Sequence, residues 1–164
     1  MSMKSNWGVK FTMNPSILNG TRNHLINQLV FFDEQYSLFY DQYVRNYGKE
    51  KQAIDEIVER YKQTLESLLS KEDSALFQSL KAITLLGSSV KVLFEEDQFE
   101  ESFTVVYPTD IDPDNNRISF LSPIGRQLLL AAPHDSVVLE SPVGRQQVQV
   151  REISFTYMGG FSSP

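Results

Sequence analysis

Cysteine is absent from this chain of 164 residues, and histidine occurs only at His24 and His134, far apart in the sequence. The absence of cysteine excludes disulfides, thiolate zinc sites, iron–sulfur clusters and cysteine nucleophiles. Two distant histidines form no histidine metal motif. Metal chemistry would have to rest on carboxylates, and we expect neither a bound metal nor another cofactor.

Long apolar runs are also missing. None approaches the roughly 20 residues that a membrane span needs, and the start, MSMKSNWGVKF, lacks the apolar core of a signal peptide. We therefore expect a cytoplasmic protein with no membrane partner. The 15 basic and 21 acidic residues give a net charge of −6, which disfavours unspecific attraction to a phosphate backbone.

Apolar side chains recur at helical spacing in the first half of the chain. From Asn23 to about Tyr47 the spacing alternates between four and three residues, at Leu25, Leu29, Phe32, Tyr36, Phe39 and Tyr43. A second segment repeats it at Ile54, Val58, Tyr61, Leu65 and Leu68. Such stripes are typical of coiled-coil seams. With a turn at Asn46–Glu50, they predict an antiparallel helical hairpin whose straight helices reach roughly 37 Å.

Aromatic residues are concentrated in the first of these helical segments, between Phe31 and Tyr47. Tyrosines suit a two-helix core that stays partly wet, because one end of the ring is polar. The alternative is an aromatic face that binds a partner.

The periodicity changes to two in the second half, after a third helical stretch from Ser74 to about Leu85. Alternating apolar residues predict strands at Val90–Phe94 and Phe103–Tyr107, and later at about Ser136–Ser141 and Gln146–Phe155. Ser122 is a helix N-cap and Pro123 a first helical residue, which predicts a short helix to about Leu130. The chain is thus predicted to be α+β, with a hairpin segment at 1–74, a helical linker at 75–87 and a sheet domain at 88–164.

The corner before this short helix carries the most specific motif. SPIGRQLL begins at Ser122, and DSVV, SPVG and VREISF follow from Asp135, Ser141 and Val150. In this order the motifs resemble the C-terminal domain of the Gre transcript-cleavage factors, over about residues 88–157. The tripeptide VYP, which ends at Pro108, is closer to the Rnk branch of that superfamily. The resemblance implies an FKBP-like antiparallel sheet around a short helix. It also implies that a two-helix arm precedes this domain, as in other members of the family.

The resemblance also implies a partner, the core of bacterial RNA polymerase. Members bind a coiled coil of the largest subunit at the rim of the secondary channel. This would place the contact at Leu121, Ser122, Pro123, Ile124, Gly125 and Arg126. The alternative is structural: Pro123 and Gly125 would only shape the corner, and Ile124 would fill the core.

The predicted tip of the hairpin departs from the cleavage-stimulating members, which use paired acidic residues there to hold a second magnesium ion. The tip candidates here include one carboxylate and three cations: Arg45, Tyr47, Lys49, Glu50 and Lys51. Because magnesium needs closely spaced hard oxygen ligands, we expect no catalytic residue, no metal site and no enzymatic activity. The basic tip would contact an acidic channel, an RNA 3′ end or nucleotide phosphates, or be a solvated turn that offsets a helix dipole.

The leading hypothesis is a polymerase-binding transcription regulator that docks at the secondary channel rim and does not stimulate cleavage. The alternatives are a genuine cleavage factor, a Rnk-like module that docks without inserting its hairpin, and a prolyl isomerase suggested by the FKBP-like fold alone. The arm distinguishes these hypotheses, since a straight protruding hairpin can enter a channel and a folded-back one cannot.

Overall fold

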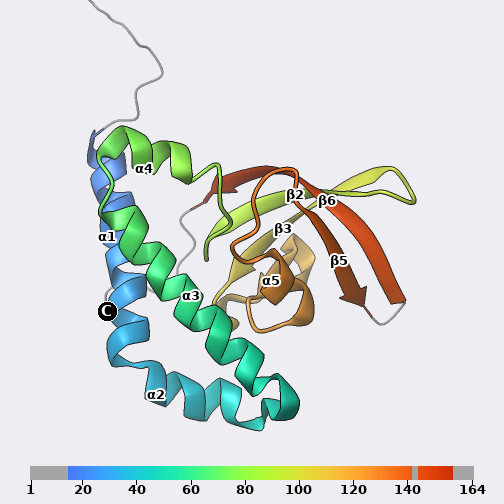
Figure 1. Ribbon diagram of the computed structural model, residues 1–164, viewed down its shortest axis with the longest axis horizontal. Coiled ribbons are helices and arrows are strands. Elements are labelled where there is room, and N and C mark those ends of the chain that lie inside the picture. Colours follow the sequence, from blue (N-terminus) through green and yellow to red (C-terminus); the bar gives the residue numbers. More distant parts are fainter. Residues whose placement is uncertain (1–14, 142–143, 157–164) are drawn as a thin grey trace, which may run out of the picture.

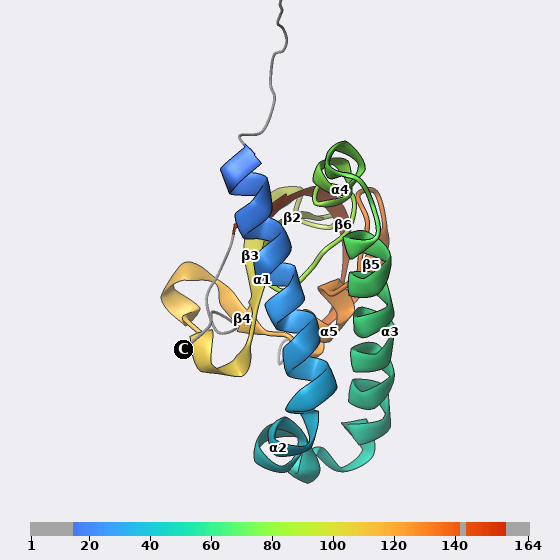
Figure 2. The same ribbon diagram turned by 90° about the vertical axis from the view of Figure 1, so that its left-hand side faces the viewer.

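Two antiparallel helices lie against a curled five-stranded sheet in the computed structural model, which describes residues 15–141 and 144–156 (Figure 1). The long helices are α1 (Pro15–Glu34) and α3 (Lys51–Leu69), and α4 (Asp73–Ser79) leads from them to the sheet. Figure 2, turned by 90°, shows α1 and α3 side by side in front of the sheet. The α+β class is therefore confirmed.

The first helix is shorter than its apolar stripe predicts. It ends at Glu34, and Gln35 leaves the helical region with φ −118° and ψ 9°. The chain then continues through the turns α2 (Tyr36–Phe39), η2 (Tyr40–Val44, a π-helix) and η3 (Arg45–Glu50, a 3₁₀-helix). The prediction of one helix from Asn23 to about Tyr47 is wrong beyond Glu34, because the chain bends there and carries Phe39 into the core.

The predicted turn at the end of the hairpin is confirmed. Gly48 has φ 63° and ψ −123°, a conformation that residues with a Cβ rarely adopt. The second apolar stripe then forms α3, with all five of its members buried. Glycine thus sets the position at which the chain reverses.

The sheet has the strand order β4-β3-β2-β6-β5. Its strands are β2 (Ser88–Phe94), β3 (Phe99–Val106), β4 (Arg117–Ser119), β5 (Ser136–Ser141) and β6 (Gly144–Phe155). All neighbours are antiparallel except β3 and β4. The predicted purely antiparallel sheet is therefore wrong at one edge, because the chain after β3 passes through two 3₁₀ turns and returns in the same direction.

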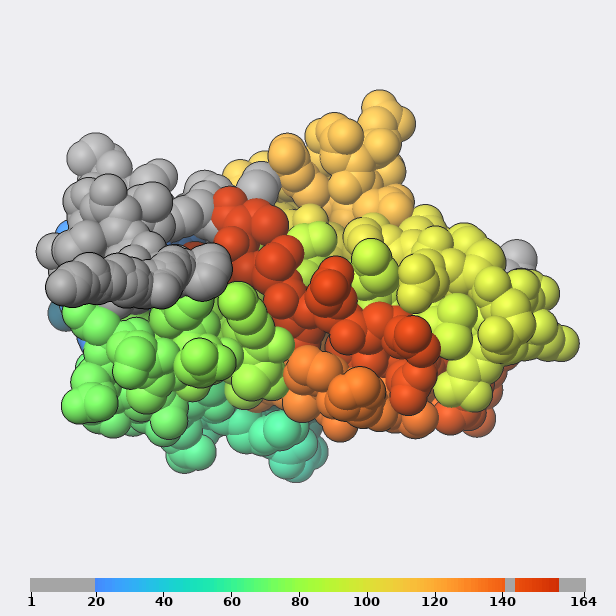
Figure 3. Space-filling model, turned by 90° about the horizontal axis from the view of Figure 1, so that it is seen from above, coloured from blue at the N-terminus to red at the C-terminus, as the bar shows by residue number. Residues whose placement is uncertain are grey.

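The predicted third helix ends early. The structure has α4 over Asp73–Ser79 instead of a helix to about Leu85. The backbone of Thr84 pairs with the 130–131 segment instead of a helix: its N–H donates to Ala131 O at 2.9 Å, and Leu130 N–H donates to Thr84 O at 2.8 Å. This pairing requires extended chain, so the linker cannot remain helical. Seen from above in Figure 3, the green segment near residue 80 lies directly beside the red strand β6.

A buried hydrogen-bond network joins the hairpin to the chain that enters β2. The Tyr61 hydroxyl of α3 donates to Gln28 Oε1 of α1 and accepts the Leu86 N–H at 2.8 Å. Gln28 Nε2 donates to Leu86 O at 3.0 Å. Burial raises the pKa of Tyr61 well above its ordinary value, so its hydroxyl stays protonated.

Aromatic rings fill the space between the helices and the sheet. Phe32 and Phe39 contact Phe120 with ring centroids 6.1 and 5.8 Å apart, and Phe31 lies edge-on to Tyr107 at 5.2 Å. The interpretation of the aromatics as core is confirmed for Phe32 and Phe39, each 1% exposed. That core is shared with the sheet domain, however, and does not belong to the two helices alone.

None of the helices in the described ranges combines the length and apolar character needed to cross a bilayer.

Candidate functional site

The strand-to-helix corner at Ser119–Gly125 is held by side-chain hydrogen bonds. Ser122 Oγ accepts the Gly125 N–H at 3.0 Å and donates to Ser119 O at 2.7 Å. Helix α5 spans Pro123–Leu128. The predicted N-cap and proline start are thus confirmed, although the helix ends two residues before the predicted Leu130.

Gly125 is required by a close approach. A Cβ built on it would lie 2.0 Å from Ser119 O and 2.9 Å from Phe120 Cα, closer than any side-chain carbon is tolerated. Because the obstacle is backbone, no rotamer change can relieve it. Gly125 therefore shapes the corner, as the structural interpretation of this residue predicted.

Only part of the predicted contact segment reaches the surface. Leu121 is 2% exposed and Gly125 is buried, whereas Ser122 and Ile124 are half-buried and Pro123 is exposed. In this arrangement Leu121 belongs to the core because it points inward beside Phe120, so it cannot itself present a side chain to a partner. A surface is left at Ser122–Ile124.

A mainly apolar groove of about 640 Å³ adjoins that surface. Its apolar wall is made by Ile111, Pro113, Ile118, Pro123 and Ile124. Ile111 is 50% exposed, and the sequence analysis assigned it no contact. The available signal was an apolar residue between two acidic ones, Asp110 and Asp112.

Arg126 connects this corner to the tip of the hairpin. Its guanidinium donates to Leu121 O at 2.8 Å and to Glu50 Oε1 at 3.2 Å. The Arg126 side chain is 16% exposed. Two groups of residues that the sequence placed in separate domains are therefore in direct contact, which no spacing in the sequence indicated.

The remaining tip residues form an exposed basic turn. Arg45 pairs with Asp41, which raises the pKa of the Arg45 guanidinium further. Tyr47, Lys49 and Lys51 lie around Gly48 at or near the surface. Glu50, the one carboxylate of the predicted tip, is held by Arg126.

Two pairs of adjacent acids lie on the helix bodies, Asp33-Glu34 and Asp55-Glu56, and one acid of each pair has a partner. Asp33 lies 3.4 Å from Lys62 Nζ, and Asp55 accepts a hydrogen bond from the Tyr36 hydroxyl. Across residues 15–141 and 144–156, no group of three His, Asp or Glu side chains is arranged to hold a metal ion.

The hairpin is not a free arm, although its end at α2 extends past the sheet domain in Figure 1. Helices α1 and α3 lie along the sheet domain, and their aromatic and polar contacts extend from Gln28 to Glu50. The expectation of a free, straight probe is therefore wrong for this arrangement. The reason is the bend at Gln35, which turns aromatic residues of the hairpin toward Tyr107 and Phe120.

Comparisons with known proteins bear on the second half of the chain. Residues 82–155 match the family described as "Transcription elongation factor, GreA/GreB, C-term". GreA of Chloroflexus aggregans is 37% identical over 68 residues, which cover 42% of this chain and 43% of that protein. GreB of Neisseria meningitidis serogroup B is 33% identical over 69 residues, with 42% of each chain covered. The chain thus spans less than half the length of these two relatives.

Among solved structures, Gfh1 (GreA factor homolog 1) of Thermus thermophilus is 21% identical with a TM-score of 0.42, covering 84% of this chain and 92% of that one. A GreA/GreB factor from Nitrosomonas europaea is 31% identical with a TM-score of 0.42, covering 45% of this chain and 62% of that one.

Proposed function

We propose, because residues 82–155 match the GreA/GreB C-terminal domain family, that this chain is a transcription factor of that family and acts on RNA polymerase without stimulating transcript cleavage. The observation that carries the proposal is the SPIGR corner, where Ser122 caps helix α5 and Pro123 is exposed beside an apolar groove. RNA polymerase is the partner that the family resemblance implies. We propose that the chain binds the core enzyme directly.

The docking surface we propose is the groove rimmed by Ser122, Pro123 and Ile124. A helical coiled coil at the rim of the polymerase secondary channel, the partner that the resemblance implies, presents apolar side chains on one face that would fill such a groove. Leu121 and Gly125 would support this surface from beneath. Arg126 would support it through its bond to Leu121 O.

Two finer features of the fold belong to the same proposal. We infer an FKBP-like arrangement for the sheet, since it curls around α5 and Gln127 Nε2 donates to Val138 O of β5. We infer that the hairpin is packed as a coiled coil, since the apolar stripes of α1 and α3 face each other, as in the contact of Phe32 with Tyr61. Neither feature implies prolyl isomerase activity.

The proposal that the protein does not stimulate cleavage rests on the residues at the hairpin tip. A second magnesium ion needs paired carboxylates, and the described tip has Glu50 bound to Arg126 amid Arg45, Lys49 and Lys51. We therefore propose that the protein is not an enzyme and that it regulates RNA polymerase by binding to it. Because the hairpin lies along its own sheet domain, docking at the rim requires no insertion.

Binding to core polymerase tests the docking. The chain should co-elute with bacterial core polymerase in gel filtration and compete with an authentic GreA. Pro123→Glu places a charge in the groove at a first-turn position where Glu suits a helix, and it should weaken binding at least about tenfold, as a charge placed in an apolar contact does. Ile26→Glu, at a 43% exposed position on α1, is the matched control and should bind normally.

Failure to co-elute, or equal binding by both variants, would disprove the docking surface. Cleavage is tested separately by adding the protein to a backtracked elongation complex. Shortened RNA would show that the chain is a genuine cleavage factor and would refute the non-cleaving proposal.

A further inference from the structure

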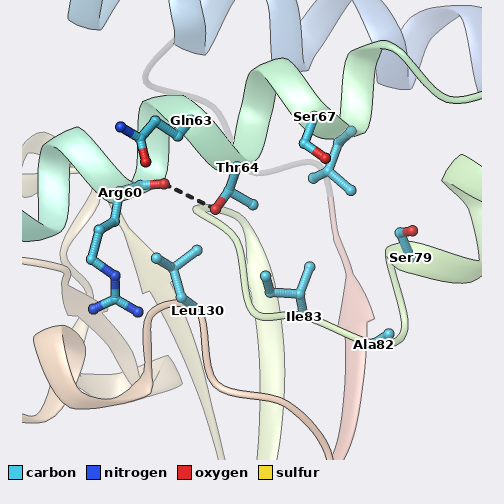
Figure 4. Close-up of a pocket in the computed structure, with 9 residues that line it drawn as sticks. Arg60, Gln63, Thr64, Ser67, Ser79, Ala82, Ile83 and Leu130 are labelled. Carbon is cyan, nitrogen blue, oxygen red and sulfur yellow. Dashed lines mark hydrogen bonds between the residues drawn. The ribbon is translucent and has the colours of Figure 1, made fainter.

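A polar groove follows the seam between α3 and the sheet domain. It consists of two adjoining cavities of about 450 and 300 Å³ that share Arg60 and Leu130. Figure 4 shows the first of them, with Arg60 reaching from α3 toward the segment that carries Leu130 and with Ile83 opposite α3. The cavities together have the size of small-molecule sites in proteins.

Two arginines line the groove in a protein whose net charge is −6, and one of them, Arg126, is paired with Glu50. The second cavity is lined by Arg60 and Arg126, against a single acid, Asp135, which accepts the Ala132 N–H at 2.8 Å. The first cavity has no acidic residue in its lining. Glu56 and Glu59 line a third cavity, which shares Arg60, Arg126 and Gln127 with the second.

Arg60 is not engaged within the folded chain. Among the side chains of the described ranges, no carboxylate lies within ion-pair distance of its guanidinium. An exposed arginine retains five donors in a planar fork, which suits phosphate oxygens. Arg126 also lines this cavity. Its guanidinium uses two donors on Leu121 O and Glu50 Oε1, and an anion bound there would meet Arg60 and the remaining donors of Arg126.

The rest of the lining is suited to a ligand larger than an inorganic anion. Gln127 lines the second cavity, and its Oε1 is buried without a hydrogen-bond partner in the described chain, while its Nε2 donates to Val138 O. A buried acceptor of this kind is satisfied by a hydroxyl or amine donor. In the first cavity Leu68, Ile83 and Leu130 offer an apolar floor, flanked by the hydroxyl groups of Ser67 and Ser79.

We propose that this groove binds a nucleoside 5′-phosphate. The phosphate lies between Arg60 and Arg126, a ribose hydroxyl donates to Gln127 Oε1, and the base covers Ile83 and Leu130. The ligand contacts the hairpin through α3 and the sheet domain through α5 and the 128–131 segment, so its binding stabilises the folded-back arrangement. This inference does not depend on the proposed function, since it needs no polymerase.

Titration calorimetry on the isolated full chain tests the site, with GMP and AMP as probes. Guanosine, adenosine and inorganic pyrophosphate separate the contributions of base and phosphate. Both nucleotides should bind, and nucleosides should not, because the charged contact supplies most of the affinity. Pyrophosphate should bind more weakly than the nucleotides, and all binding should weaken with added salt.

Arg60→Gln should weaken nucleotide binding about tenfold, since it removes a charge-assisted contact. Ile83→Ala should weaken nucleotide binding and leave pyrophosphate binding unchanged. The matched control is Arg45→Gln, which removes an equal charge at the exposed tip and should bind nucleotide like the unaltered protein. Far-ultraviolet circular dichroism confirms that each variant is folded.

The proposal is overturned if neither nucleotide binds at millimolar concentration, or if Arg60→Gln binds as well as the unaltered protein. It is also overturned if Arg60→Gln and Arg45→Gln lose affinity equally, because the effect would then be one of net charge. A protein that binds nucleotide and fails to bind polymerase would leave this site standing and remove the proposed function.

Discussion

The sheet domain and the helical hairpin differ in what holds each of them together. Strand β2 is paired along its length with β3 and β6, so the centre of the sheet is fixed by hydrogen bonds within the domain. The hairpin has no such internal frame beyond α1 against α3. Its bent end is held by two rings of the other region, Phe120 and Tyr107, and the middle of α3 is held by the Leu86 backbone.

This difference shows why the hairpin cannot be treated as an independent arm. Moving it away from the sheet would expose Phe39 and leave the Tyr61 hydroxyl, Gln28 and the Leu86 backbone without their partners. A buried polar group without a partner lowers the stability of the fold, so water would have to replace each of these hydrogen bonds. The predictions below test each contact between the two regions, starting with the largest.

Phe39→Ala should cause the largest loss of stability. Phe39 is 1% exposed and contacts rings from both regions, so its truncation leaves a cavity at the junction. The free energy of unfolding should fall by about 3 to 5 kcal/mol, as measured by urea denaturation. Leu38→Ala, at a neighbouring position that is 70% exposed, should change it by less than about 0.5 kcal/mol. Equal effects of the two variants would mean that the hairpin end is not docked.

The sequence predicted the parts of this molecule that depend on local chemistry. The Ser122 cap, the proline start of α5, the turn at Gly48 and the buried stripe of α3 all follow from spacing and residue type. The bend at Gln35 could not be predicted, because no proline or glycine marks it and its cause lies far along the chain in Tyr107 and Phe120.

The candidate site divides in the same way. Motif resemblance located the corner, which lies within the residues that match the GreA/GreB C-terminal family. Which of its residues face outward depends on packing, so Leu121 and Ile124 could not be told apart by a pattern. Contacts between distant segments, such as Arg126 with Glu50, leave no trace in a single sequence.

Tyr61→Phe tests the polar contact between the regions. The substitution keeps the ring and removes the hydroxyl that serves both Gln28 and Leu86. The Leu86 N–H loses its acceptor in a buried position, so the free energy of unfolding should fall by about 1 to 3 kcal/mol. Tyr47→Phe, at the exposed tip, is the control and should be neutral in the same urea titration. A neutral Tyr61→Phe would show that water replaces the hydroxyl.

Glu50→Gln tests the ion pair that fastens the tip to the corner. The Glu50 side chain is 46% exposed, so solvent screens the pair and the loss of stability should stay below about 1 kcal/mol. The more sensitive readout is amide hydrogen exchange, which should become faster in η3. Asp41→Asn breaks the exposed pair with Arg45 and should leave the Arg126 contact intact. Unchanged exchange in Glu50→Gln would mean that the aromatic contacts alone hold the tip.

His24 gives the smallest effect, visible as a dependence of stability on pH. It is 8% exposed on α1, beside the ring of Phe155 in β6, and burial lowers its pKa from the ordinary 6.5. The unfolded chain therefore takes up a proton near pH 6.5 while the folded chain resists it. Stability is full above that pH and declines as the pH falls toward the folded pKa.

Urea midpoints at about pH 7.5 and about pH 5.5, on either side of the ordinary histidine pKa, measure this decline. His24→Gln, which cannot be protonated, should show a smaller decline than the unaltered protein. His134→Gln is the matched control, because His134 is exposed; it should keep the decline. If all three proteins lose stability equally, the pH dependence arises from carboxylates, and the junction between hairpin and sheet does not sense the charge of His24.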